Sequence, residues 1–181
     1  ALIYVGVLMM KNELYIEFDK PKYSITSFMT LLMMVLGYSI TDGIGFMTAL
    51  KESGIDCIGK KITLLGAGGA ATAITMQAAL DGVAEISLFN RKDDFYARGI
   101  HNVEVVNSET NCKATLFDLD DHDALRKEIE DSYLLINATS VGMGELKDLM
   151  PIPDASYLRK DLYVADVIYA PKETKLLKVA R

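Results

Sequence analysis

The stretch that decides the fold is KITLLGAGGAATAITMQAAL, residues 61–80. Its first five residues are mostly apolar and read as a short buried strand, and its last eleven, Ala70–Leu80, read as a helix. The glycine-rich turn between them has the spacing GxGxxA. A lone GxGxxA turn is common, but its position between a strand and a helix favours dinucleotide binding over a purely structural turn.

Each small residue of the turn has a physical reason to be there. Gly66 permits a tight turn, Gly68 lets the backbone approach a pyrophosphate, and the small side chain of Ala71 lets the helix pack close to the strand. The first N–H groups of the helix and its dipole would hold the phosphates. The predicted phosphate-binding residues are Gly66, Ala67, Gly68, Gly69 and Ala70.

The chain beyond this unit alternates between apolar runs and helical segments. The predicted strands are Ile62–Leu65, Glu85–Phe89, Ala114–Phe117, Tyr133–Ile136 and Leu162–Ile168, and the predicted helices are Ala70–Leu80, Asp121–Asp131 and Lys172–Ala180. Short apolar strands separated by helices are typical of a parallel sheet covered on both faces. The sequence therefore predicts an α/β fold, a Rossmann-like doubly wound parallel sheet.

One segment does not fit this alternation. A helix that opens near Asp94–Arg98 is expected to be cut short by Gly99, which leaves an irregular stretch up to Asn111. Either the connection to the next strand is irregular or residues are missing from it. His101 falls in this stretch and is an unlikely catalyst for that reason.

Composition excludes several classes of protein. The net charge of −6 argues against a general nucleic-acid binder. The two cysteines, Cys57 and Cys112, form no disulfide framework or metal motif, and a reduced cytoplasmic setting fits best. No basic segment precedes the first apolar stretch, so we expect no signal peptide. The most apolar run, Ile25–Leu36, is shorter than the roughly 20 residues of a bilayer span, and we expect no membrane partner.

The second strand ends in Asn90, Arg91, Lys92 and Asp93, the corner that faces the adenosine ribose in this fold. A carboxylate there would accept the ribose hydroxyls of NAD, and a guanidinium would pair with the 2′-phosphate of NADP. The sequence offers both, and we predict NADP, with NAD as a second cofactor. Asp93 is either a ribose acceptor or the N-cap of the next helix. A solvated polar turn is the alternative interpretation.

Several motifs together resemble the shikimate dehydrogenase family, including its quinate/shikimate branch. They are GAGGAATA from Gly66, LFNRKDDFY from Leu88, NATSVGM from Asn137 and DVIYAP from Asp166. Upstream, GYSITDGIGF from Gly37 is similar to the family's GYNTDGxGF segment. The resemblance runs from about residue 37 to the C-terminus, and the combination is far more specific than any single motif.

The resemblance implies reversible hydride transfer between NADP(H) or NAD(H) and the 3-keto or hydroxyl position of dehydroshikimate or quinate. It places the catalytic aspartate at Asp42 and adds cofactor contacts at Thr139, Ser140, Val167 and Tyr169. It also implies that residues 1–45 are part of a smaller, truncated α/β substrate-binding domain and that residues 46–181 form the NAD(P)-binding domain. The expected partner is a small-molecule substrate, shikimate or quinate, and a homodimer is compatible with the sequence.

The chain also departs from the family pattern. Ile40 and Ala170 stand where the family usually has asparagine, and no segment carries the neighbours of the catalytic lysine. Family chains are considerably longer, so we expect this sequence to be an incomplete version of such an enzyme. A non-catalytic dinucleotide-binding sensor is the alternative function. A glutamyl-tRNA reductase-like or methylene-tetrahydrofolate dehydrogenase-like enzyme shares the cofactor fold but lacks support from NATSVGM beside NRKD.

Overall fold

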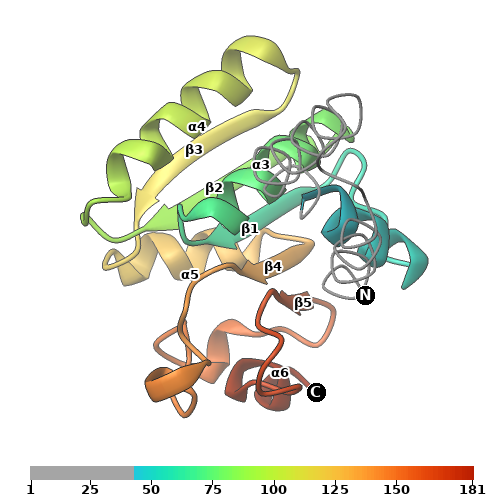
Figure 1. The fold of residues 1–181 in the computed structure, drawn as a ribbon. Helices are drawn as coiled ribbons and strands as arrows, with labels where there is room; N and C mark the ends of the chain where they lie inside the picture. The colour runs from blue at the N-terminus through green and yellow to red at the C-terminus, as the bar shows by residue number, and fades with distance from the viewer. Residues whose placement is uncertain (1–42) are drawn as a thin grey trace, which may run out of the picture. The chain divides into compact units, whose positions relative to one another are not determined.

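The computed structural model describes residues 43–181 of the chain (Figure 1). Residues 43–52 are helical, and the elements that follow alternate between strand and helix. In chain order these are β1 (Lys61–Leu65), α3 (Gly69–Leu80), β2 (Glu85–Asn90), α4 (Tyr96–Glu109), β3 (Lys113–Asp118), α5 (His122–Glu130), β4 (Leu134–Asn137), β5 (Tyr163–Asp166) and α6 (Lys175–Ala180). Two short 3-10 turns, Gly144–Leu146 and Ala155–Tyr157, lie between β4 and β5.

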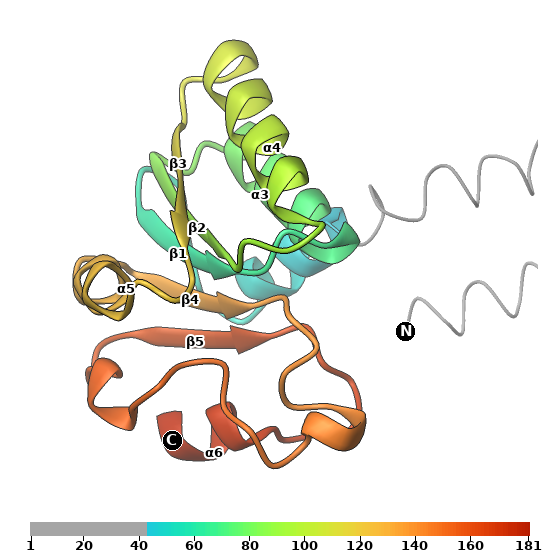
Figure 2. The same ribbon diagram turned by 90° about the vertical axis from the view of Figure 1, so that its left-hand side faces the viewer.

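The five strands form one parallel sheet in the order β3-β2-β1-β4-β5. Figure 2 shows α3 and α4 on one side of the sheet and α5 on the other. This order reverses between β1 and β4, which is the crevice where doubly wound sheets bind ligands. The predicted Rossmann-like fold is therefore confirmed. The predicted substrate-binding segment, residues 1–45, lies almost wholly outside the described residues.

The side chains of strand β1 contribute to two separate hydrophobic cores, one on each face of the sheet. Ile62 and Leu64 pack into the cluster beneath α3 and α4, whereas Leu65 packs into the cluster with Leu125 of α5 and Leu176 of α6. All five side chains are fully buried. Because a parallel sheet is covered on both faces, its strands are apolar at nearly every position, and this produces the continuous apolar runs in the sequence.

Helix α4 corrects the prediction for the segment after Asp94. The helix continues through Gly99 to Glu109, so the connection is a regular crossover and His101 lies on an exposed helical surface. Gly99 is needed for close packing: a Cβ there would lie 3.0 Å from Leu116 Cδ1 and 3.4 Å from Ala67 Cβ. Glycine costs a helix roughly 1 kcal/mol relative to alanine, and the tight contact with β3 offsets this cost.

Several helices and strands begin or end at residues other than those predicted, and side chains cap the starts of two of the helices. The Asp121 carboxylate accepts a hydrogen bond from the N–H of Ala124 and caps α5. Thr174 caps α6, which begins at Lys175, three residues later than predicted. Strand β5 spans Tyr163–Asp166 and is shorter than the predicted strand at both ends.

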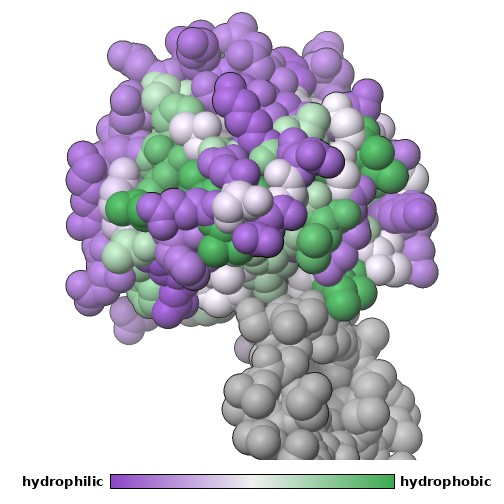
Figure 3. All heavy atoms as spheres, turned by 90° about the horizontal axis from the view of Figure 1, so that it is seen from above, coloured by the Kyte–Doolittle hydropathy of each residue, from purple (hydrophilic) through white to green (hydrophobic). Residues whose placement is uncertain are grey.

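The surface of the described residues is ordinary for a globular protein. Figure 3 shows hydrophilic residues over much of the visible face, with hydrophobic residues scattered between them. Within residues 43–181, every helix is too short or too polar to traverse a bilayer. The apolar run Ile25–Leu36 lies outside the described part of the chain.

Arg159 holds the carboxyl end of α5 against the sheet. Its guanidinium Nη1 donates hydrogen bonds to the carbonyl oxygens of Ile129, at 2.8 Å, and Glu130, and Nη2 donates to that of Ser132 at 2.6 Å. Its Nε also pairs with Asp161 at 3.0 Å. Ile129 and Glu130 are the last residues of α5 and Ser132 follows its C-cap, so one side chain bonds three carbonyls at and just after the helix end.

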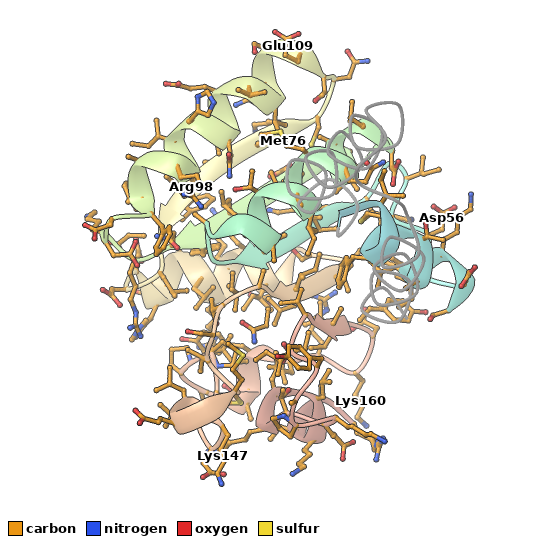
Figure 4. All side chains as sticks on the ribbon, viewed as in Figure 1. Asp56, Met76, Arg98, Glu109, Lys147 and Lys160 are labelled. Carbon is orange, nitrogen blue, oxygen red and sulfur yellow. The ribbon has the colours of Figure 1, made fainter. Side chains whose placement is uncertain are left out.

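We predict that Arg159→Met lowers the free energy of unfolding by about 2–4 kcal/mol, because it removes several charge-assisted hydrogen bonds to carbonyls. Urea denaturation followed by circular dichroism measures this. The matched control is Lys160→Met at the neighbouring exposed position (Figure 4), which we expect to change stability by less than about 0.5 kcal/mol. Equal effects of the two substitutions would contradict the role given to Arg159.

Candidate dinucleotide-binding site

A cavity of about 640 Å³ opens at the carboxyl edge of the sheet, where β1, β2 and β4 end. It brings together most of the residues predicted from sequence to bind a cofactor. Its lining includes Gly66, Ala67, Gly68, Asn90, Arg91, Asp93, Thr139 and Ser140. The volume is in the range of small-molecule sites, roughly 300–1,000 Å³.

Gly66 makes the turn after β1 and is sterically required there. Its φ of 104° lies in the region that L side chains avoid, and a Cβ would sit 2.9 Å from the carbonyl oxygen of Ala138. Its N–H donates to the Phe89 carbonyl at 2.7 Å. The backbone of β1 thus passes between the ends of β2 and β4 without room for a side chain.

Gly68 is a glycine for a different reason. Its φ of −71° suits any residue, and no atom of the described residues lies within 4 Å of a Cβ built on it. It lines the cavity and is the N-cap of α3, where no side chain caps the helix. The open space beside the start of a 12-residue helix is where a phosphate would meet the positive end of the helix dipole.

Asn90 links this turn to the corner after β2. Its Oδ1 accepts the Ala67 N–H at 3.0 Å, and its Nδ2 donates to the Arg91 carbonyl at 2.7 Å and to Asp93 Oδ1 at 2.9 Å. The side chain is only 6% exposed. The Ala67 N–H is therefore already engaged within the protein.

Asp93 is not the N-cap of α4. That position is Phe95, and the Asp93 carboxylate instead accepts the Phe95 N–H at 2.9 Å in the turn before the helix. The reason is the bond from Asn90, which holds Asp93 back at the end of β2. Asp93 still lines the cavity, so its other predicted role, as a ribose acceptor, is compatible with its position.

The two cations of this corner are exposed and paired with acids at the end of β3 and just after it. Arg91 lies 3.9 Å from Asp120 through Nε, and Lys92 Nζ lies 2.8 Å from Asp118 Oδ2. Arg91 lines the cavity, whereas Lys92 does not belong to its lining within the described part of the chain.

The end of β4 supplies the opposite wall. Asn137 is fully buried, and its Oδ1 accepts both the N–H and the hydroxyl of Thr139, at 3.1 and 2.7 Å. Its Nδ2 donates to Asp166 Oδ1 at 3.1 Å, which ties β4 to β5. Thr139, which lines the cavity together with Ser140, is therefore oriented by a buried amide.

Four more of the predicted contacts, besides Lys92, do not line this cavity. In the described structure, neither Val167 nor Tyr169 belongs to the lining, and Tyr169 is 78% exposed. Gly69 and Ala70, at the start of α3, also lie just outside the lining. Asp42 lies outside the described residues. Its neighbour Gly43 is in close contact with α3, because a Cβ there would lie 2.4 Å from the Ala73 carbonyl oxygen.

Sequence reasoning missed one wall of the cavity. The loop after β4 contributes apolar residues, and α6 contributes a lysine at its start: Leu146, Leu149, Met150, Pro151, Ile152, Pro153 and Lys175. The apolar and proline-rich run LMPIP, residues 149–153, was the local signal in the sequence for this wall. Lys175 has no ion pair among the described residues and could meet an anionic ligand.

Metal or thiol chemistry has no support in this part of the molecule. Residues 43–181 contain no group of three or more His, Cys, Asp or Glu side chains placed to hold a metal ion. Cys57 and Cys112 are free and buried, and burial raises the pKa of each thiol to about 11. Neither thiol is therefore an activated nucleophile.

The two glycines of the turn allow a sharp test. Gly66→Ala should destabilise the fold by about 1–3 kcal/mol, because it forces a strained backbone and a clash. Gly68→Ala should change stability by less than about 0.5 kcal/mol. It should nevertheless weaken dinucleotide binding by about tenfold or more, the equivalent of 1.4 kcal/mol, because its methyl group enters the open space. Urea denaturation and fluorescence titration with NADPH measure the two effects. Unchanged affinity in folded Gly68→Ala would show that no ligand approaches this backbone.

Comparison with known proteins supports the motif assignment. The chain is 59% identical over 146 residues to a protein named shikimate dehydrogenase (NADP(+)) from Listeria innocua, a match that covers 81% of this chain and 50% of the relative. The chain thus spans about half the length of the curated relatives it matches. A scan against models of protein families finds no match.

Solved structures give the same result. Shikimate 5-dehydrogenase from Listeria monocytogenes, in complex with shikimate and NAD, matches with a TM-score of 0.76 at 59% identity, covering 77% of this chain and 48% of that one. Quinate dehydrogenase from Corynebacterium glutamicum with NAD has a TM-score of 0.66 at 27% identity, covering 78% and 48%. A shikimate dehydrogenase with NADP+ has a TM-score of 0.61 at 36% identity, covering 77% and 46%. Motifs, sheet order and relatives agree: over 81% of its length the chain is homologous to proteins of the shikimate dehydrogenase family.

Proposed function

We propose that this protein is an NADP(H)- or NAD(H)-dependent oxidoreductase that reversibly reduces the 3-keto group of dehydroshikimate or dehydroquinate. The observation that carries the proposal is the cavity at the carboxyl edge, which combines an open glycine turn with polar groups from three strand ends. The names of the relatives, dehydrogenases that act on such hydroxyl groups, support the same reaction.

The proposed cofactor contacts follow from this cavity. The backbone from Gly68 to Ala70 would hold the pyrophosphate, and Asn90, Arg91 and Asp93 lie where the adenosine ribose would be. Thr139 and Ser140 would contact the nicotinamide half. The ammonium of Lys175, which has no ion pair within residues 43–181, would add positive charge for the phosphates. Lys92, Val167 and Tyr169 stay proposals that rest on the family pattern.

The chemistry would be divided between the cofactor and the protein. A nicotinamide held by these residues would supply the hydride chemistry at the substrate carbon. The protein must then supply or remove a proton at the substrate oxygen, within hydrogen-bond reach. Asp42 would hold the substrate hydroxyl, and the close contact of Gly43 with Ala73 would fix the position of this segment relative to α3.

The domain assignment is part of the same proposal. Residues 46–181 would form the NAD(P)-binding domain, and residues 1–45 would belong to the substrate-binding domain. Met47 and Leu50 support this, because they are buried in the core beneath α3. We further propose a cytoplasmic location, for which the two free buried cysteines are suited.

Titration of the 181-residue chain with NADPH and NADH, followed by an absorbance assay with shikimate or quinate and oxidised cofactor, tests the function. We expect saturable binding and the appearance of reduced nicotinamide. Binding without turnover for either substrate would instead indicate a dinucleotide-binding sensor. Absence of binding for both nucleotides would overturn the proposal.

Asp42→Asn tests the catalytic role. We expect turnover to fall by about a hundredfold or more, because a neutral amide cannot help to move a proton. The affinity for NADPH should change little, since the nucleotide contacts lie elsewhere. A parallel loss of turnover and of nucleotide affinity would point to misfolding rather than catalysis.

A further inference from the structure

The ends of β2 and β3 lie side by side, and this places acids beside the cations of the ribose corner. In the sheet register Asn90, the last residue of β2, is the partner of Asp118, the last residue of β3. The residues that follow each strand therefore share one corner. There the Lys92 ammonium lies 2.8 Å from the Asp118 carboxylate, and the Arg91 guanidinium lies 3.9 Å from that of Asp120.

The pairing is local and electrostatic. The hydrogen bond from Lys92 lowers the pKa of Asp118, and the same bond raises the pKa of Lys92, so both groups are charged at neutral pH. Asp118 also accepts the N–H of Asp120 at 3.1 Å, which holds the two acids in one turn. Arg91 and Lys92 are more than half exposed and can turn toward a ligand only by leaving their carboxylates.

We propose that Asp118 and Asp120 set the cofactor preference of this protein by lowering its affinity for a 2′-phosphorylated dinucleotide. A 2′-phosphate must compete with Asp118 for Lys92 and with Asp120 for Arg91, and it must accept two neighbouring negative charges. A free 2′-hydroxyl is uncharged, so it does not compete for these cations and is not repelled by the two carboxylates. The corner therefore accommodates NAD despite its two cations. This inference rests on the proposed function, because it assumes that the adenosine ribose lies at Asn90–Asp93.

An alternative explanation for a lower affinity for the 2′-phosphorylated dinucleotide is a general excess of negative charge near this corner. Helix α5 begins directly after this turn and carries Asp123 in its first turn, exposed and without an ion pair among the described residues. Asp123 thus offers the same charge a few residues further along the chain. Asp121 is unsuitable as a control because its carboxylate caps the helix.

The test compares Asp118→Asn, Asp120→Asn and the double variant with Asp123→Asn as the matched control. Asparagine at position 118 retains an oxygen that accepts the Asp120 N–H, so the turn is preserved. Dissociation constants for NADPH and NADH are measured by fluorescence titration of each variant at low and moderate salt. The inference is judged by the ratio of the dissociation constant for NADPH to that for NADH in each variant.

We expect each single variant to bind NADPH about two- to fivefold more tightly and the double variant about tenfold more tightly, with NADH affinity nearly unchanged. The gain should shrink at moderate salt because the pairs are exposed. An equal gain for both nucleotides, or a gain from Asp123→Asn as large as the others, would overturn the inference. If the unchanged protein binds neither nucleotide, the proposed function itself fails.

Discussion

The site depends on one steric constraint, the passage of the Gly66 backbone beside the carbonyl of Ala138. A side chain at Gly66 would meet that carbonyl at 2.9 Å, and the φ of 104° excludes most residues in any case. Because the turn is this tight, α3 begins close behind β1, and its N-terminus lies beside the ends of β2 and β4. The cavity exists because these three ends converge there.

Much of the fold could be predicted because parallel sheets leave a strong pattern. Strands buried on both faces are continuous apolar runs, and all five strands were located from apolar runs, although the edge strands β3 and β5 are only partly buried. The length of helix α4 was predicted wrongly, because a propensity rule treats Gly99 as a helix breaker. Gly99 faces Leu116 and Ala67, and this tertiary contact, which no local pattern reveals, outweighs its propensity.

The parts of the candidate site that consist of backbone could be predicted from the sequence. The ion pairs between its side chains could not. The glycine turn and the Asn90 corner were found because their residue types are dictated by space and by position at strand ends. The partners of Arg91 and Lys92 lie on the next strand along the edge of the sheet, and only the register brings them together. Lys175 is far away in sequence and could not be placed without the fold.

The Asn90 side chain has a consequence for attempts to redesign cofactor choice. One carboxamide bonds the glycine turn through its oxygen and the following corner through its nitrogen. Substitution of Asn90 would disturb the proposed phosphate contact and the proposed sugar contact in a single step. The side chains of the exposed neighbours Arg91 and Lys92 make no such bond to the glycine turn among the described contacts. These two residues can therefore be substituted without disturbing the turn. We expect laboratory evolution toward another nucleotide to change Arg91 and Lys92 and to retain Asn90.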